Sequence, residues 1–104
     1  MIYSTLLDWA KEHNVIEECQ NRFWCCYDSY EKEDPEEFSQ SFTSLKSDIE
    51  LKLHRISHEF YSFDPENQKA AVIMDIFVKD SYVGYYKELY LPTGEFFDEY
   101  FVIE

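Results

Sequence analysis

The N-terminal third of the chain carries apolar residues at the spacing of one helical face. They follow one another three and four residues apart, which is the repeat of an α-helix. Asn14 followed by Glu17 matches a capping pair, so we expect a break near His13–Asn14. This predicts one helix over about 4–13 and a longer one over about 15–31. The residues of the stripe are Ile2, Leu6, Trp9, His13, Ile16, Cys19, Phe23, Cys26 and Tyr30.

The segment Asp34–Glu37 predicts the start of a third helix. Asp34 can cap it, the proline that follows fits the first helical position, and two glutamates favour the positive end of the helix dipole. We expect this helix to end near Ser47. Its buried side is marked by Phe38, Phe42 and Leu45.

From Asp48 onward the apolar period changes from helical to two, which is typical of strands. Ile49, Leu51 and Leu53 alternate with polar residues, and the apolar phase then slips to Ile56, which predicts a bulge. A second strand carries Val72, Met74, Ile76 and Val78 on one face. The last two strands are expected at Tyr82–Leu91 and Glu95–Ile103. The turns between the four strands are predicted at Asp64–Asn67, Lys79–Ser81 and Pro92–Gly94.

Helices over about 1–47 followed by strands over about 48–104 predict a single α+β domain. Two to three helices should pack on one face of a four-stranded antiparallel meander, and the pattern leaves open which face they cover. In this order of elements the chain resembles small cystatin-like and NTF2-like domains. That resemblance implies a cone-shaped cavity, or a dimer formed through the exposed face of the sheet.

The charge balance adds a prediction about partners. The chain has 104 residues with 22 acidic and 9 basic side chains, a net charge of −13, and 19% aromatic residues. Disordered acidic tails are poor in aromatics, so we expect the negative charge to lie on a folded body. Such a surface steers encounter with a basic partner. Scattered cations argue against nucleic acid and anionic membranes as partners.

Tyrosines and carboxylates of the last two strands, together with the acids near the third helix, are the candidate partner-binding residues. The alternative is that one strand face packs on the helices while rings of the other cover neighbouring carboxylates, and that the acids near the helix are caps. The candidates are Tyr82, Tyr86, Glu88, Tyr90, Asp98, Glu99, Glu33, Asp34, Glu36 and Glu37.

The histidines and cysteines do not form a strong candidate for a metal-binding or catalytic site. His54 and His58 share a strand face unless a bulge separates them, and Asp75 could lie opposite. Without a third fixed ligand we expect no metal site and no cofactor. The three cysteines are odd in number and two are adjacent, as suits a reducing cytoplasm.

No catalytic motif occurs in the sequence, so we expect that the protein is not an enzyme. The segment Met1–Trp9 lacks a cationic leader and a long apolar run, so we expect no secretory signal.

These observations favour a small cytoplasmic interaction protein that binds and masks a basic protein partner. In size, acidity and tyrosine content the chain resembles bacterial toxin-immunity proteins, which implies a basic target such as a nuclease toxin. Two alternatives stay open. One is an NTF2-like small-ligand-binding domain with His54, His58 or Asp75 at the pocket mouth. The other is a structural homodimer formed through the tyrosine-rich sheet face.

Overall fold

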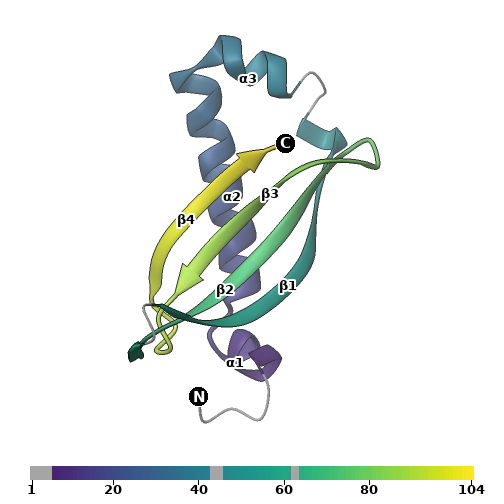
Figure 1. The fold of residues 1–104 in the computed structure, drawn as a ribbon. Coiled ribbons are helices and arrows are strands. Elements are labelled where there is room, and N and C mark those ends of the chain that lie inside the picture. Colours follow the sequence, from purple (N-terminus) through teal and green to yellow (C-terminus); the bar gives the residue numbers. More distant parts are fainter. Residues whose placement is uncertain (1–5, 43–45, 62–63) are drawn as a thin grey trace.

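The computed structural model describes residues 6–42, 46–61 and 64–104, and within them it confirms the α+β prediction. Three helices precede four strands that pair antiparallel in the order β1-β2-β3-β4 (Figure 1). The elements are α1 Leu6–Glu12, α2 Val15–Glu33, α3 Pro35–Ser41, a short 3-10 turn η1 at Lys46–Asp48, β1 Ile49–Tyr61, β2 Asp64–Val78, β3 Ser81–Tyr90 and β4 Phe96–Ile103. No helix in the described ranges is both long enough and apolar enough to span a membrane.

The helix boundaries follow two local signals. The break between α1 and α2 falls at Asn14, as predicted, because this residue takes the left-handed conformation with φ 55°. Its side chain makes no capping hydrogen bond, so the expected capping pair with Glu17 is wrong. Asp34 does cap α3, since its Oδ1 accepts the backbone N–H of Glu37 at 3.2 Å. That helix ends at Ser41 and not near Ser47, and Leu45 lies outside the described residues.

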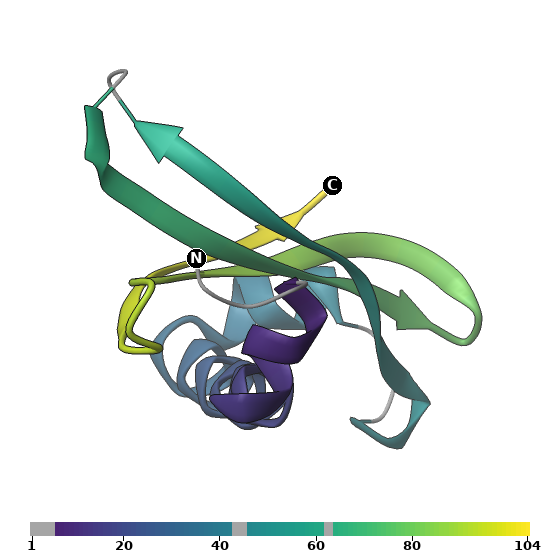
Figure 2. The same cartoon turned by 90° about the horizontal axis from the view of Figure 1, so that it is seen from below.

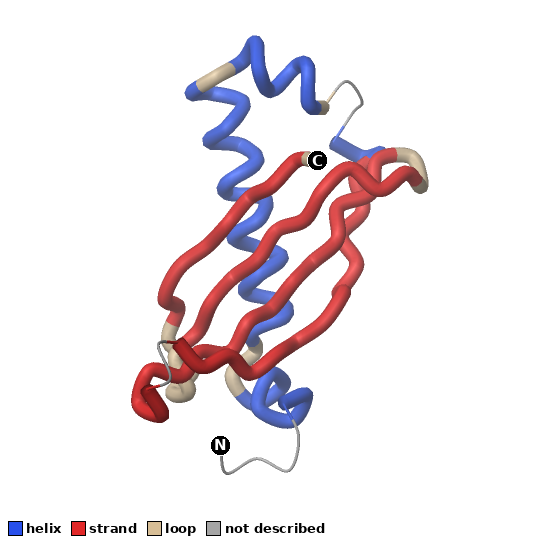
Figure 3. The backbone as a smooth tube through the Cα atoms, in the orientation of Figure 1, coloured by secondary structure: helices blue, strands red, loops and turns tan. Residues whose placement is uncertain are grey.

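Two of the three predicted turns connect the strands (Figure 3), and the register shows the predicted bulge in β1. The β1–β2 register shifts between Leu53 and Arg55, where the apolar phase of the sequence slips. The β2–β3 turn, Lys79 and Asp80, has φ 48° and 67°, the pair of positive angles that a two-residue hairpin loop needs. The turn expected at Asp64–Asn67 is wrong, because β2 already begins at Asp64.

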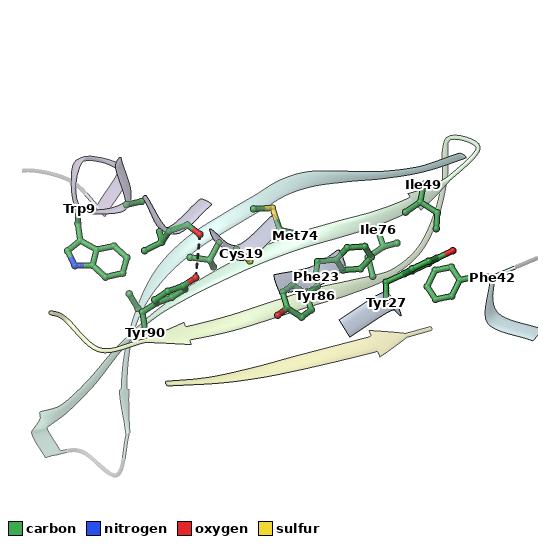
Figure 4. Packing of buried hydrophobic residues seen from close by; sticks show 14 of the residues in the cluster. Trp9, Cys19, Phe23, Tyr27, Phe42, Ile49, Met74, Ile76, Tyr86 and Tyr90 are labelled. Carbon is green, nitrogen blue, oxygen red and sulfur yellow. Dashed lines mark hydrogen bonds between the residues drawn. The ribbon is translucent and has the colours of Figure 1, made fainter. Parts of the chain in front are cut away.

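All three helices lie on one side of the sheet, and the other side is open (Figure 2). The covered face is the one that carries Val72, Met74 and Ile76, all fully buried, so the structure settles which face the helices cover. Against it α2 packs Phe23 and Tyr27, and the resulting core is shown in Figure 4.

The open face of the sheet has balanced charge. Among the strand residues whose side chains are described, the register places four basic and four acidic side chains there: Lys52, Arg55, Lys69 and Lys87, and Glu50, Glu59, Asp75 and Asp98. In contrast, residues 6–42, which form the helices, include ten acidic and three basic residues. The negative charge is therefore concentrated on the helix side of the molecule.

Candidate partner-binding groove

A groove runs between α2 and the edge strand β4, which point in the same direction in Figure 1. Its volume is about 830 Å³. We call it the α2–β4 groove, and its lining residues come from α2, from α3 and from β4: Arg22, Cys25, Cys26, Ser29, Tyr30, Glu33, Glu37, Phe96, Glu99, Phe101 and Ile103.

A buried carboxylate lies beneath one end of this groove. Glu88 of β3 is fully buried, and its Oε1 lies 3.2 Å from Nη1 of Arg22. The hydroxyl of Tyr90 donates to the same oxygen, and the hydroxyl of Tyr86 lies 2.6 Å from Oε2. A carboxylate is costly to bury unless it is paired and hydrogen-bonded, and this one has a guanidinium and two hydroxyls around it.

Tyr86 connects the buried carboxylate to the groove wall. Its hydroxyl also lies 2.6 Å from Oε2 of Glu99 on β4. A phenol has a single proton to donate, so Glu88 and Glu99 compete for it. Burial, followed by the hydrogen bonds with the two glutamates, raises the pKa of Tyr86 well above the ordinary tyrosine range. Burial and the Glu88 hydrogen bond raise the pKa of Tyr90 in the same direction.

The groove lining combines negative charge with aromatic rings. Three carboxylates, of Glu33, Glu37 and Glu99, line it against one guanidinium, that of Arg22. Arg22 already pairs with Glu88, and it lies 4.4 Å above the ring of Phe96. The groove therefore offers what a basic, partly apolar segment requires for binding.

The cysteines give the groove little thiol chemistry. All three are free; Cys19 is buried, Cys25 is exposed and Cys26 lies between these extremes. Burial, followed by the charge of Glu99, raises the pKa of Cys26 to about 11, so its thiolate is scarce at neutral pH. Across the described ranges no group of three or more His, Cys, Asp or Glu side chains is placed to hold a metal ion.

The two histidines of β1 do not meet. His54 Nδ1 lies 2.9 Å from Asp75 Oδ2 on the open face, whereas His58 Nε2 lies 2.7 Å from Gln68 Oε1. The bulge after Leu53 shifts the alternation, so His58, opposite Ala70 in the register, falls on the helix side. Neither histidine lines the α2–β4 groove or the smaller hollow of about 440 Å³ beside α3.

The structure distributes the predicted partner-binding residues over three places. Glu33, Glu37 and Glu99 line the groove, and Asp34 and Glu36 are exposed at the start of α3. Exposed positions on the open face hold Tyr82 and Asp98. Buried in the core are Tyr86, Glu88 and Tyr90.

The expectation that Tyr86, Glu88 and Tyr90 present a contact surface therefore needs correction. All three have no exposed surface, because β3 is a central strand and these positions face α2. Their polar groups bond to one another, to Arg22 and to Glu99, and none of the three has a surface that a partner could contact in this structure.

Several groove residues were not among the sequence-based candidates: Arg22, Tyr30, Phe96, Phe101 and Ile103. The sequence signal for Arg22 was its position four residues after Glu18, with which it pairs at 3.6 Å. For Phe101 and Ile103 the signal was their shared strand face with Glu99. Which strand forms the edge beside a helix depends on the tertiary arrangement, which the local pattern does not contain.

Comparison of the chain with models of protein families, with curated proteins and with solved structures gives no match. The arrangement of the helices and strands makes the molecule an α+β domain with helices on one sheet face. The resemblance to cystatin-like and NTF2-like domains gains no support from the comparisons and stays a prediction.

Proposed function

We propose that this chain is a small acidic interaction protein of the cytoplasm that binds and masks a basic protein partner in the α2–β4 groove. The proposal is supported by three carboxylates and three aromatic rings that lie along one groove on the acidic side of the molecule. Long-range attraction steers a basic partner to this side, and the rings supply apolar contact after docking.

This arrangement suits the mechanism of an inhibitor or immunity protein. A nuclease binds phosphates through clustered lysine and arginine side chains, so its active cleft is basic. A surface with net negative charge can cover such a cleft and exclude the nucleic acid by charge and by volume. The resemblance of the chain to toxin-immunity proteins in size and acidity supports this target class.

The helix side suits this role better than the open sheet face. On the open face Lys87 pairs with Glu59 at 3.4 Å, and Lys69 lies 4.6 Å above the ring of Phe97. The hydroxyl of Tyr100 lies 3.3 Å from Asp98, so ring and acid contact each other there. A basic partner gains little net attraction from such a face because its cations and carboxylates are balanced.

The proposal is tested by affinity capture with two variants of matched charge. The groove variant carries Glu33→Lys and Glu37→Gln, and the control variant carries Glu12→Lys and Glu50→Gln, at exposed positions that do not line the groove. Native protein and both variants are used to capture proteins from a lysate of the source organism at low salt. Quantitative mass spectrometry then measures what each retains.

We expect one basic protein at near-equal stoichiometry on the native protein and on the control variant, and at least about tenfold less on the groove variant. Equal capture by both variants would show that net charge alone, and not the groove, governs binding. A captured protein that is acidic or neutral would contradict the proposal as well.

A small apolar ligand in the same groove is the second candidate, because about 830 Å³ lies within the roughly 300–1,000 Å³ of small-molecule sites. The salt dependence of binding distinguishes the two candidate functions. Binding of an apolar ligand survives high salt, whereas a charge-steered partner associates more slowly as the ionic strength rises.

A further inference from the structure

The two edges of the sheet differ in how they are protected against further strand pairing. Natural edge strands are blunted by bulges, prolines and charged side chains. The β1 edge has such protection, with the bulge after Leu53 and the charged residues Lys52 and Arg55. The second half of β4, residues 100–103, reads Tyr-Phe-Val-Ile and has no charge, no proline and no register shift.

The backbone of β4 presents hydrogen-bonding groups to that edge. The N–H of Glu104 donates to the carbonyl of Val83 at 2.9 Å, so this pair is a hydrogen-bonded pair of the β3–β4 ladder. Such pairs alternate along antiparallel strands. The backbone groups of Phe101 and Ile103 are therefore directed away from β3, toward the edge that pairs with no strand among the described residues.

The same alternation places the groove beside the free edge. Phe101 and Ile103 direct their side chains to the helix side, where they line the α2–β4 groove. The ring of Phe101 lies 6.0 Å from that of Tyr30 on α2. A strand added about 4.8 Å from β4 would lie along this groove, and every second side chain of it would face the groove carboxylates.

We propose that the free edge of β4 binds an extended basic segment of the partner protein as a fifth, antiparallel strand. Lysine or arginine at alternate positions of that segment faces Glu33, Glu37 and Glu99, and backbone bonds form with Phe101 and Ile103. The antiparallel direction continues the pairing of the rest of the sheet. This inference rests on the proposed function and gives its docking mode.

Charge argues for a basic strand and against a second copy of this chain. Two-fold pairing of β4 with itself, centred on Phe101, would place Asp98 of one copy opposite Glu104 of the other. Like charges directly opposite each other destabilise a strand pair. Each copy also has a net charge of −13, which opposes association.

The test uses three synthetic peptides that differ only in backbone methylation. The parent peptide alternates lysine and valine over 8 residues, the length of β4. One derivative is N-methylated at the lysines and the other at the valines, so charge and composition are the same. A peptide residue opposite Phe101 or Ile103 has its side chain on the same face, toward the groove, and exchanges backbone hydrogen bonds with that residue. Lysines whose side chains face the groove therefore direct their N–H groups toward β4.

Lysine methylation is expected to weaken binding at least about tenfold, since it removes several backbone hydrogen bonds of about 1 kcal/mol each. Valine methylation should leave the affinity within about threefold of the parent, because those nitrogens face away from β4. NMR should show the amides of Phe101 and Ile103 protected from exchange by the parent peptide. The inference is overturned if the two methylations weaken binding equally, if valine methylation weakens it more, or if the parent peptide does not bind.

A protein variant gives an independent measurement. Ile103→Pro removes an N–H that faces the free edge, a position where an edge strand tolerates proline. The native chain and Ile103→Val should bind the parent peptide alike, and Ile103→Pro should bind at least about tenfold more weakly. Unchanged binding to a folded Ile103→Pro variant overturns edge pairing. The capture experiment above uses no peptide, so it judges the proposed function separately.

Discussion

At the scale of single residues, the contact between Arg22 and Glu88 explains how a strongly acidic chain tolerates a carboxylate in its core. Glu88 is fully buried, while the Arg22 side chain is 34% exposed and also covers the ring of Phe96. Removing one partner of such a pair leaves the other charge buried without compensation.

Arg22→Ala is therefore expected to lower the free energy of unfolding by about 2–4 kcal/mol, below the roughly 3–5 kcal/mol of a fully buried pair because Arg22 is partly exposed. Urea unfolding at neutral pH measures this loss. The control is Arg55→Ala, at an exposed position of β1, which should change stability by less than about 0.5 kcal/mol. Equal effects of the two substitutions would contradict the importance of the buried pair.

The raised pKa values of Tyr86 and Tyr90 predict loss of stability in alkali. The unfolded chain releases these phenolic protons near pH 10, the ordinary tyrosine value, whereas the folded protein retains them to higher pH. Because the folded state then binds more protons, its stability is fully present below about pH 10 and falls as the pH rises further. The raised pKa of Cys26, about 11 against 9.0, adds to this fall above about pH 9.

Urea midpoints measured between about pH 8 and about pH 11 should decline most steeply above about pH 10. Tyr86→Phe cannot release that proton, so its decline should be shallower than that of the native protein, even if its stability at neutral pH is lower. If the urea midpoints of the two proteins decline equally with pH, the raised pKa of Tyr86 does not contribute to the loss of stability.

The sequence left two interpretations open for Tyr86, Glu88 and Tyr90, a contact surface or packing against the helices, and their burial agrees with the packing. The sequence showed that they share a strand face, but it did not show that this face meets α2. A glutamate among tyrosines matches an exposed recognition surface as well as a buried hydrogen-bonded cluster. The deciding residue is Arg22, which is 66 positions away from Glu88 in the chain.

At the scale of elements, periodicity predicted most helices and strands. The change from a helical to a two-residue period marked the start of the sheet, and the slip before Ile56 marked the bulge, because both patterns follow from burial of one face. One wrong element prediction concerns a segment whose residues are compatible with either a turn or a strand. Asp64–Asn67 has turn-forming residues, yet strand pairing with β1 extends β2 to Asp64.

The β2–β3 turn provides a prediction at this scale. Lys79 and Asp80 hold positive φ angles that ordinary side chains disfavour. Replacing them together by Lys79→Asn and Asp80→Gly leaves the net charge unchanged and should stabilise the fold by about 1 kcal/mol. Thermal or urea unfolding measures the gain. Lys79→Val, which is β-branched, should destabilise; a gain from that variant would contradict the turn geometry.

At the scale of the whole molecule, the helices cover one sheet face (Figure 2), and their acidic residues concentrate the negative charge on that side. The total charge was evident from the sequence, and so was the expectation of a basic partner. The location of the charge was not evident, because acidic residues are spread along the chain. The charge becomes one-sided because the strand residues whose side chains are described place equal numbers of cations and carboxylates on the open face, while the excess acid of the helices lies on the other side.

According to the proposed function, a basic partner is attracted to the α2–β4 groove and held there. The decisive measurement is the association rate of the captured partner with the native protein, the groove variant and the control variant over a range of ionic strength. We predict that the native and control proteins associate fast at low salt and slow down steeply as salt rises, while the groove variant associates more slowly with a weaker salt dependence. Identical rates and salt dependences for the groove variant and the control variant would contradict the claim.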